Sequence, residues 1–193
     1  MPHTKRYWDS LYSSNSTGWD VGYISTPLKE YFDQLTNKNI RILIPGAGKA
    51  WEAEYLYKLG FKNTFILEFS EEAIMEFTTR CPWFPVSQIV SEDFFAHSNK
   101  YDLIVEQTFF SSLTPLSREK YVNKICDLLV DTGKYMGVLF NHEFDFEGPP
   151  FGGSVDEYVE LFKPIFNFII FETAFNSIKP RQGREVFLLL KKK

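Results

Sequence analysis

The sequence predicts one α/β domain with a doubly wound, mostly parallel sheet of seven strands and an antiparallel hairpin at the sheet edge. Three observations predict this fold. From about residue 40 onward, short apolar runs rich in β-branched residues alternate with segments of helical periodicity. The first run ends in Pro45-Gly46-Ala47-Gly48, which is a strand-to-helix turn. The last two runs have only a loop between them, so they are expected to pair antiparallel.

Each element follows from a local pattern. The hydroxyl and proline of Ser25-Thr26-Pro27 predict a helix start, and Ser154-Val155-Asp156-Glu157 has the form of a capping box. We expect strands at residues 40–44, 64–68, 86–90, 101–106, 133–140, 166–173 and 185–190. We expect helices at residues 25–35, 51–59, 71–80, 117–130 and 154–162.

The length fits one domain. The chain has 193 residues and is 44% hydrophobic, so a single domain over residues 1–193 can bury a core of ordinary size. Residues 1–24 differ from the rest because they are polar and rich in serine, yet they carry Trp8, Tyr12 and Trp19. We therefore expect an N-terminal arm that folds over something rather than a disordered tail.

Composition excludes several classes of protein. The net charge is −4 and the only basic run is the final three lysines, which disfavours nucleic acid as a partner. Cys81 and Cys126 lie far apart, which is typical of free thiols in the cytoplasm. The apolar runs are too short to span a membrane, and no signal peptide is recognisable. The three histidines lack the spacing of metal ligands, so we expect no metal.

Candidate ligand-binding residues directly follow the predicted strands, because a doubly wound sheet binds ligands beyond the carboxyl ends of its strands. Gly46 and Gly48 permit a tight turn and a close approach of the backbone to a ligand. Glu68 ends the second strand 20 residues after Gly48, where a carboxylate can accept hydrogen bonds from ribose hydroxyls. Both NAD and S-adenosylmethionine sites use an acidic residue there.

The glycine turn itself separates the cofactors. The dinucleotide fingerprint requires a third glycine where this chain has the bulky Trp51, which disfavours NAD. A phosphate-binding P-loop would require a glycine at Leu43 and a hydroxyl at Ala50, and both requirements fail. The remaining candidate is S-adenosylmethionine.

Motifs along nearly the whole chain carry a family resemblance. They are Trp8 and Tyr12, Trp19-Asp20, the run from Leu43 to Ala50, Glu68, Tyr101-Asp102-Leu103-Ile104, Gly148-Pro149-Pro150-Phe151 and Ile178-Lys179-Pro180-Arg181. In these the sequence resembles the thiopurine S-methyltransferase family, closest to its thiol and halide methyltransferase branch. The resemblance implies a class I, Rossmann-like methyltransferase that uses S-adenosylmethionine and releases S-adenosylhomocysteine.

The resemblance also implies roles for individual residues. Expected cofactor contacts are Trp8 and Tyr12 as a cover, Gly46 and Gly48 at the methionine end, Glu68 at the ribose, Asp93 and Phe94 beside the adenine, and Gln107. Trp19 is expected to line the substrate side, and Arg181 to hold an anion or to lower the pKa of a thiol. Gln107 stands where the thiopurine branch has an arginine, which disfavours charge-based recognition of an acidic thiopurine.

The predicted function is methyl transfer to a small soft nucleophile: a thiol, thiocyanate or a halide, thiopurine-like thiols included. Two alternatives stay open. One is an O- or N-methyltransferase with Glu106 or Asp20 as its base, and the other is a cofactor-binding module without catalysis. Pro149-Pro150 follow the fifth strand rather than the fourth, which disfavours a DNA-methyltransferase motif. We expect a small-molecule acceptor, no membrane or nucleic acid partner, and a monomer or weak homodimer.

Overall fold

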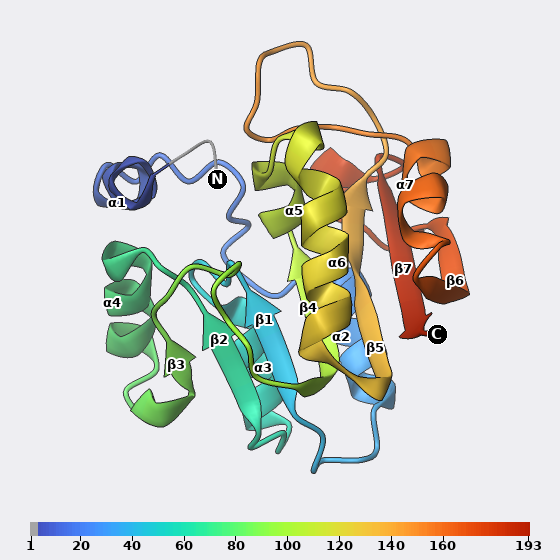
Figure 1. The fold of residues 1–193 in the computed structure, drawn as a ribbon. Coiled ribbons are helices and arrows are strands. Elements are labelled where there is room, and N and C mark those ends of the chain that lie inside the picture. Colours follow the sequence, from blue (N-terminus) through green and yellow to red (C-terminus); the bar gives the residue numbers. More distant parts are fainter. Residues whose placement is uncertain (1–3) are drawn as a thin grey trace.

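The computed structural model of the chain describes residues 4–193, so His3, one of the three histidines considered above, lies outside the described residues. A seven-stranded sheet runs through the molecule in the order β3-β2-β1-β4-β5-β7-β6 (Figure 1). The strands are β1 (Ile42–Pro45), β2 (Thr64–Leu67), β3 (Ile89–Val90), β4 (Tyr101–Gln107), β5 (Leu129–Phe140), β6 (Phe166–Thr173) and β7 (Glu185–Lys192).

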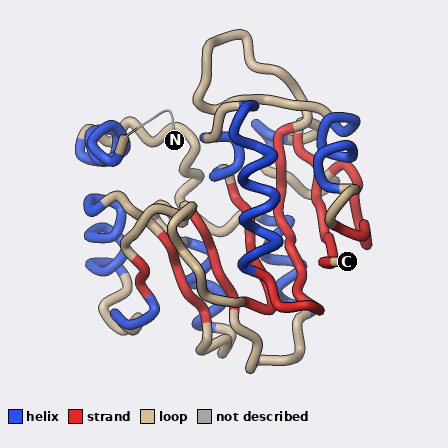
Figure 2. Tube along the Cα trace, viewed as in Figure 1, coloured by secondary structure: helices blue, strands red, loops and turns tan. Residues whose placement is uncertain are grey.

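The helices are α1 (Lys5–Ser13), α2 (Thr26–Gln34), α3 (Trp51–Lys58), α4 (Glu71–Arg80), α5 (Phe109–Ser112), α6 (Arg118–Leu128) and α7 (Val155–Phe162). Three short 3₁₀ turns, η1 (Val86–Gln88), η2 (Pro115–Ser117) and η3 (Lys179–Arg181), complete the described elements. Helices cover both faces of the sheet, with α6 and α7 on one face and α2 and α3 on the other (Figures 1 and 2).

The strand directions confirm the predicted fold class. Strands β3, β2, β1, β4 and β5 pair in parallel, and β7 pairs antiparallel with both β5 and β6. The chain moves outward from β1 through β2 to β3, then returns to the other side of β1 with β4. The order therefore reverses between β1 and β4, which is the topological switch point where such sheets bind ligands.

Two hydrophobic cores hold the layers together. One contains Leu28 and Phe32 of α2 with Leu56 of α3, all without exposed surface, against one face of the sheet. The other contains Ile125 of α6 and Phe162 of α7 on the opposite face. Burial on both faces explains why the inner strands are almost continuously apolar.

Two predicted boundaries are wrong. Residues 86–88 form the turn η1 rather than strand, because Pro85 fixes the chain just before the turn and only Ile89–Val90 reach β2. The predicted helix 117–130 ends at Leu128, and β5 begins at Leu129 rather than at residue 133. Leu129 is buried beside Tyr101 in the sheet, and an apolar run at this point satisfies helical and strand periodicity equally.

The arm contains a helix that the sequence analysis did not predict. Thr4 caps α1 with its hydroxyl oxygen, which accepts a hydrogen bond from the Tyr7 amide at 3.3 Å. The helix lies beside α4, where the Ser70 hydroxyl donates to Asp9 at 2.7 Å and Lys5 forms an ion pair with Glu71. These polar contacts place α1 over the carboxyl end of β2 (Figure 1).

None of the helices among residues 4–193 is long and apolar enough to cross a membrane.

Candidate active site

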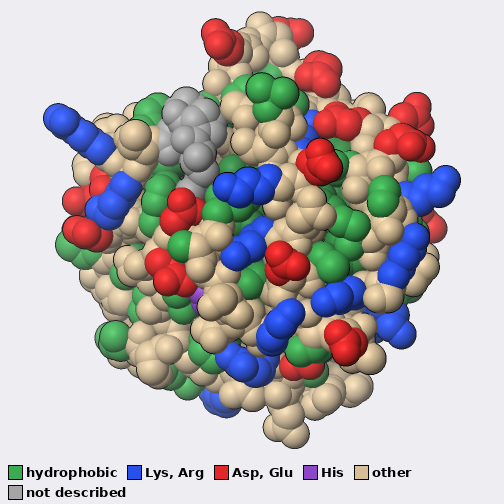
Figure 3. Space-filling view, in the orientation of Figure 1, with side chains coloured by type: hydrophobic (Ala, Val, Ile, Leu, Met, Phe, Trp, Pro, Cys, Tyr) green, Lys and Arg blue, Asp and Glu red, His purple; other side chains and the backbone are tan. Residues whose placement is uncertain are grey.

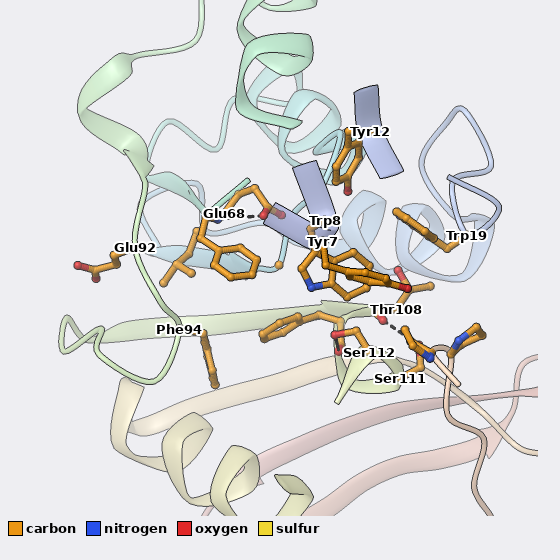
Figure 4. Close-up of a pocket in the computed structure, with 16 residues that line it drawn as sticks. Tyr7, Trp8, Tyr12, Trp19, Glu68, Glu92, Phe94, Thr108, Ser111 and Ser112 are labelled. Carbon is orange, nitrogen blue, oxygen red and sulfur yellow. Dashed lines mark hydrogen bonds between the residues drawn. The ribbon is translucent and has the colours of Figure 1, made fainter. Parts of the chain in front are cut away.

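The first candidate site is a cavity between the arm and the carboxyl ends of β1, β2 and β4, at the switch point. It holds about 770 Å³ of empty space, its open mouth included, which suits a ligand of cofactor size. We call it the main cavity, and its lining residues are Tyr7, Trp8, Tyr12, Trp19, Gly46, Leu67, Glu68, Phe69, Glu92, Phe94, Thr108, Phe109, Ser111, Ser112, Pro149 and Pro150. Figure 4 shows Tyr12, Glu68 and Trp19 on one side of this space and Phe94 and Ser112 on the other.

The glycine turn after β1 has a conformation and a location that require glycine. Gly46 and Gly48 have φ angles of +57° and +53°, in the left-handed region. A Cβ atom on Gly46 would overlap the ring of Phe109, and one on Gly48 would lie 2.6 Å from the Tyr12 hydroxyl. The expected turn is therefore present, and it leaves room for the rings that surround the main cavity.

Glu68 is held by the backbone around it. Its Oε2 accepts from the Gly48 amide at 2.8 Å, and its Oε1 accepts from the amides of Phe69 and Ser70 at 2.9 Å each. Burial raises the pKa of this carboxyl, and the three hydrogen bonds oppose that rise. A carboxylate accepts about four hydrogen bonds, so Glu68 retains about one accepting position for a ligand, rather than the two that a pair of ribose hydroxyls would use.

Aromatic rings of the arm form one wall of the main cavity. The ring centroid of Trp19 lies 5.5 Å from that of Trp8 and 5.8 Å from that of Tyr12, both edge to face. Tyr12 is only 6% exposed. Burial is the main cause that raises the pKa of its hydroxyl well above the usual value, and the negative charge of the nearby Glu68 adds to that rise. Edge-to-face packing fixes the rings against one another and leaves them facing the cavity.

On the side expected to hold the adenine, one of the two predicted residues lines the cavity. Phe94 does so, whereas Asp93 does not. The Asp93 carboxylate instead accepts from the Phe95 amide at 2.8 Å, which caps the turn that follows β3. The prediction that Asp93 faces the ligand is therefore not supported by its position.

Glu92, the residue before Asp93, lines the main cavity. Its Oε1 lies 2.5 Å from Nδ1 of His97, and Nε2 of the same ring lies 2.8 Å from the Tyr101 hydroxyl. His97 is 2% exposed. The buried His97 ring, held by Tyr101, therefore fixes the position of the Glu92 carboxyl. Sequence analysis missed Glu92, although the acidic pair after the third strand was a visible signal.

The short helix α5 forms the wall opposite the arm. It starts after Thr108, which has a φ of +63°, and its Phe109 packs edge to face on Phe94 at 5.3 Å. The hydroxyls of Ser111 and Ser112 donate to backbone carbonyls of the same turn at 2.7 Å each. Because a hydroxyl has two accepting lone pairs, both serines can still accept hydrogen bonds. Neither serine was predicted as a site residue.

Glu106 does not line the main cavity. It has no exposed surface; one carboxylate oxygen accepts from the Phe110 amide at 2.7 Å and the other from the Tyr121 hydroxyl at 2.5 Å. Burial raises the pKa of Glu106 to about 7. Its contacts anchor the start of α5, and this geometry does not support the expectation that Glu106 acts as a proton acceptor for the substrate.

Gln107 lines a second space, which we call the recess, on the other side of the glycine turn. The recess holds about 490 Å³, its open part included. It is lined by Trp19, Asp20, Val21, Tyr23, Ser25, Ile44, Gly46, Ala47, Gly48, Lys49, Trp51, Glu52, Gln107 and Thr108. Oε1 of Gln107 and Oγ of Ser25 are buried, and neither has a hydrogen-bond partner in the described part of the chain. Such groups normally have a partner, so the recess is suited to a polar ligand end.

Asp20, the other candidate base, also lines the recess and already has three partners. Its carboxylate accepts from the Trp51 indole at 2.8 Å and from the Gly22 amide at 2.8 Å, and it pairs with Lys49 at 3.3 Å. Burial raises the pKa of the neighbouring Glu52 to about 7, and that carboxyl is also inside the protein.

Arg181 lines a third space, which we call the annex. Its Nη2 donates to the Trp19 carbonyl at 2.6 Å, and its Nη1 lies 3.4 Å from Oε1 of Glu185. The annex holds about 970 Å³, open solvent at its mouth included. It is lined by Gly18, Trp19, Phe140, His142, Phe144, Phe146, Pro149, Pro150, Pro180, Arg181 and Arg184. The annex shares Trp19, Pro149 and Pro150 with the main cavity, so the two spaces adjoin.

No group of three or more His, Cys, Asp or Glu side chains among residues 4–193 is arranged to hold a metal ion.

Comparison with known proteins agrees with this geometry. A family model described as thiopurine S-methyltransferase matches residues 3–187. The chain is 26% identical to "Probable thiol methyltransferase 2" and 24% identical to "Thiocyanate methyltransferase 1", both of Arabidopsis thaliana, each over 92% of this chain and 81% of the relative. Its fold matches a Burkholderia thailandensis 1,6-didemethyltoxoflavin-N1-methyltransferase bound to its substrate and S-adenosylhomocysteine, with a TM-score of 0.79, 14% identity, and coverage of 98% of this chain and 87% of that one.

Proposed function

This chain belongs to the thiopurine S-methyltransferase family, and from that premise we propose that its acceptor is a small soft nucleophile such as a thiol, thiocyanate or a halide, thiopurine-like thiols included. The chain is an S-adenosylmethionine-dependent methyltransferase that acts on a small molecule. Family membership therefore sets aside the alternative of a binding module without catalysis. The names of the thiol and thiocyanate methyltransferase relatives support the acceptor class.

The main cavity and the recess together fit S-adenosylmethionine. Glu68 would accept a ribose hydroxyl, and Phe94 with Glu92 would flank the base. Gln107 Oε1 and Ser25 Oγ, the buried atoms without partners, would bind the charged amino acid end in the recess. Trp8 and Trp19 would cover the sulfur, where aromatic faces favour a cation.

One observation supports a soft nucleophile. Among the described residues that line the main cavity there is no Lys, Arg or His, and the two carboxylates, Glu68 and Glu92, are both already hydrogen-bonded. When bound, S-adenosylmethionine supplies a methyl group on a positively charged sulfur. An anionic acceptor is attracted by that charge and needs no base from the protein, whereas an alcohol or amine acceptor would need one. Neither Glu106 nor Asp20 is positioned to act as that base, because both carboxylates are already hydrogen-bonded within the protein.

The proposal is tested by turnover with acceptors that differ in whether they carry a proton. We expect S-adenosylhomocysteine to bind in titration calorimetry, and methanethiol, thiocyanate and iodide to be methylated. The rate with iodide should not change with pH between about 6 and 9, because halide ions do not titrate, whereas the rate with methanethiol should follow ionisation of the thiol. Methylation of alcohols or amines only, with a carboxylate-like pKa in the rate profile, would contradict the proposal.

The proposal includes the setting in which the enzyme works. We propose a single domain over residues 1–193, with 1–24 as an arm over the cofactor, acting in the cytoplasm as a monomer or weak homodimer and without binding nucleic acid. The net charge of −4 supports the last point. On the face shown in Figure 3, basic and acidic side chains are interspersed. Light scattering would test the oligomeric state, and a DNA-binding titration would test the absence of nucleic acid binding.

A further inference from the structure

The annex is larger and more aromatic than a small inorganic acceptor requires. Phe140, Phe144 and Phe146 form a continuous wall, with centroid distances of 5.1 Å and 5.2 Å between successive rings. Phe146 is 57% exposed, although it is a large apolar side chain. Apolar surface of this kind at the edge of a hollow is typical of a ligand site. The annex therefore fits an organic body beside the reacting atom.

The charges in the annex are opposite to those in the main cavity. Among the described residues, no Asp or Glu lines the annex, whereas Arg181 and Arg184 both line it. His142 is half-buried, and burial lowers its pKa, so at neutral pH the positive charge in the annex comes from the arginines. An anionic group on the ligand would find a favourable field there.

The loop between β5 and α7 is the long loop at the top of Figure 1, and its acidic residues do not line the annex. In the run from Phe144 to Glu147 the aromatic residues line the annex, whereas Asp145 and Glu147 are exposed and do not line it. These acids repel an anion in solution, and salt screens that repulsion. A guanidinium inside the annex acts at shorter range, so it decides which groups are bound there.

The two arginines are not equivalent. Arg181 is already occupied by the Trp19 carbonyl and Glu185, and its side chain is 11% exposed. Arg184 is exposed, and none of the described residues forms a hydrogen bond or ion pair with its guanidinium. Arg184 therefore has all five donors available for a carboxylate, which guanidinium binds in two parallel hydrogen bonds.

We propose that the annex binds the body of an aromatic or other apolar thiol that carries an anionic group, and that Arg184 recognises that group. This inference rests on the proposed function, because the thiol sulfur must reach the main cavity past Trp19 and Pro149-Pro150, which line both spaces. Arg181 then acts as a positioning residue, since it holds the backbone of Trp19 between the two spaces.

The test compares 4-mercaptobenzoate with 4-methylbenzenethiol, which have similar shapes but differ in charge. Arg184→Gln should lower kcat/KM for 4-mercaptobenzoate about 10-fold, mainly through KM, because one charged hydrogen-bonded contact is lost. The same substitution should change kcat/KM for 4-methylbenzenethiol less than about 2-fold. Arg184→Lys should restore part of the loss. Each variant is compared with wild type on the same thiol, so differences in intrinsic reactivity cancel.

Lys179→Gln is the matched control, because Lys179 is an exposed cation on η3, five residues before Arg184 in the sequence, and does not line the annex. It should leave both thiols unaffected. In the wild type, the methyl ester of 4-mercaptobenzoate should show a KM about 10-fold higher than the free acid, which tests the contact without a mutation.

Four results would overturn the inference. An equal loss for both thiols would show a structural effect of Arg184, and an equal effect of Lys179→Gln would show a general field of the surface. Methylation of 4-methylbenzenethiol without any advantage for the carboxylate would reject the role of Arg184 and leave the proposed function standing. Methylation of neither thiol, nor of the inorganic acceptors, would reject the proposed function and this inference together.

Discussion

The main cavity and the annex adjoin at Trp19 and Pro149-Pro150 but are built in opposite ways. The main cavity is formed at the ends of β1, β2 and β4, and its acids are fixed by backbone amides and a buried histidine. The annex is formed by a long loop and by η3, and its Arg184 has no partner in the described residues. A site for a constant cofactor can be rigid, whereas a site for the acceptor can vary without disturbing it.

The charge difference has a chemical consequence. A cationic ligand is favoured in the main cavity by two carboxylates and the aromatic rings of the arm, and an anionic ligand is favoured in the annex by two guanidinium groups. The two reactants are therefore drawn to opposite sides of Trp19. The predictions that follow alter one side at a time and ask whether the other side responds.

The largest effect is expected from Glu68→Ala, which removes the central acceptor of the main cavity. Three amides, two of them buried, lose their partner, so we expect the free energy of unfolding to fall by about 2–4 kcal/mol and the Kd for S-adenosylhomocysteine to rise at least about 100-fold. Calorimetry and denaturant unfolding measure both quantities. Glu160→Ala, at an exposed acid on α7, is the control. A Kd unchanged in the folded variant would remove Glu68 from the cofactor site.

A smaller effect is expected from Gly46→Ala. The new Cβ meets the Phe109 ring, which must move into the main cavity, so the Kd for S-adenosylhomocysteine should rise about 10-fold. Gly60→Ala is the matched control, because Gly60 has a φ of +95° but open space around it. It should cost about 1 kcal/mol of stability through backbone strain alone and leave the Kd unchanged. Equal changes in Kd would show that backbone strain, rather than the ring contact, sets the affinity.

Much of the main cavity could be predicted from the sequence because its residues are tied to regular elements. A glycine turn directly after β1 and an acid directly after β2 have fixed places once the strands pair. The sequence could therefore predict Gly46 and Glu68, which line the cavity, and Gly48, whose amide donates to Glu68. The choice between Glu92 and Asp93 depends on which of two neighbouring acids caps the turn after β3. In the sequence either acid could cap the turn, and only the folded structure shows that Asp93 caps it and Glu92 lines the cavity.

Arg184 of the annex could not be predicted, and the reason is different. Arg184 is exposed and follows a glycine in a short connection, so in sequence it resembles any surface arginine. Arg184 reaches the annex because β5 pairs with β7. The Asn141 amide donates to the backbone carbonyl of Arg184 at 2.8 Å, which places Arg184 beside the loop that carries Phe144. Contacts between residues more than 40 positions apart are set by the fold and leave no local pattern.

The smallest effect on turnover is expected from Glu106→Gln, because Glu106 lines neither the main cavity nor the annex. Gln keeps the shape and can still accept from Phe110, so kcat with thiocyanate should stay within about 3-fold of wild type, whereas loss of a general base would cost about 100-fold or more.

Stability should nevertheless respond to pH through this carboxyl. Burial raises the pKa of Glu106 from 4.5 to about 7 in the folded protein, so between these values the folded state binds more protons than the unfolded state. The stability contributed by the protonated carboxyl is therefore present below pH 4.5 and is lost as the pH rises toward 7. Glu106→Gln should reduce the fall in unfolding free energy between pH 5 and pH 8 by about 1–3 kcal/mol. Glu52, whose pKa is also about 7 through burial, should keep part of that fall in the variant. A variant with unchanged pH dependence but with kcat reduced about 100-fold would instead place Glu106 in the reaction itself and join it to the main cavity.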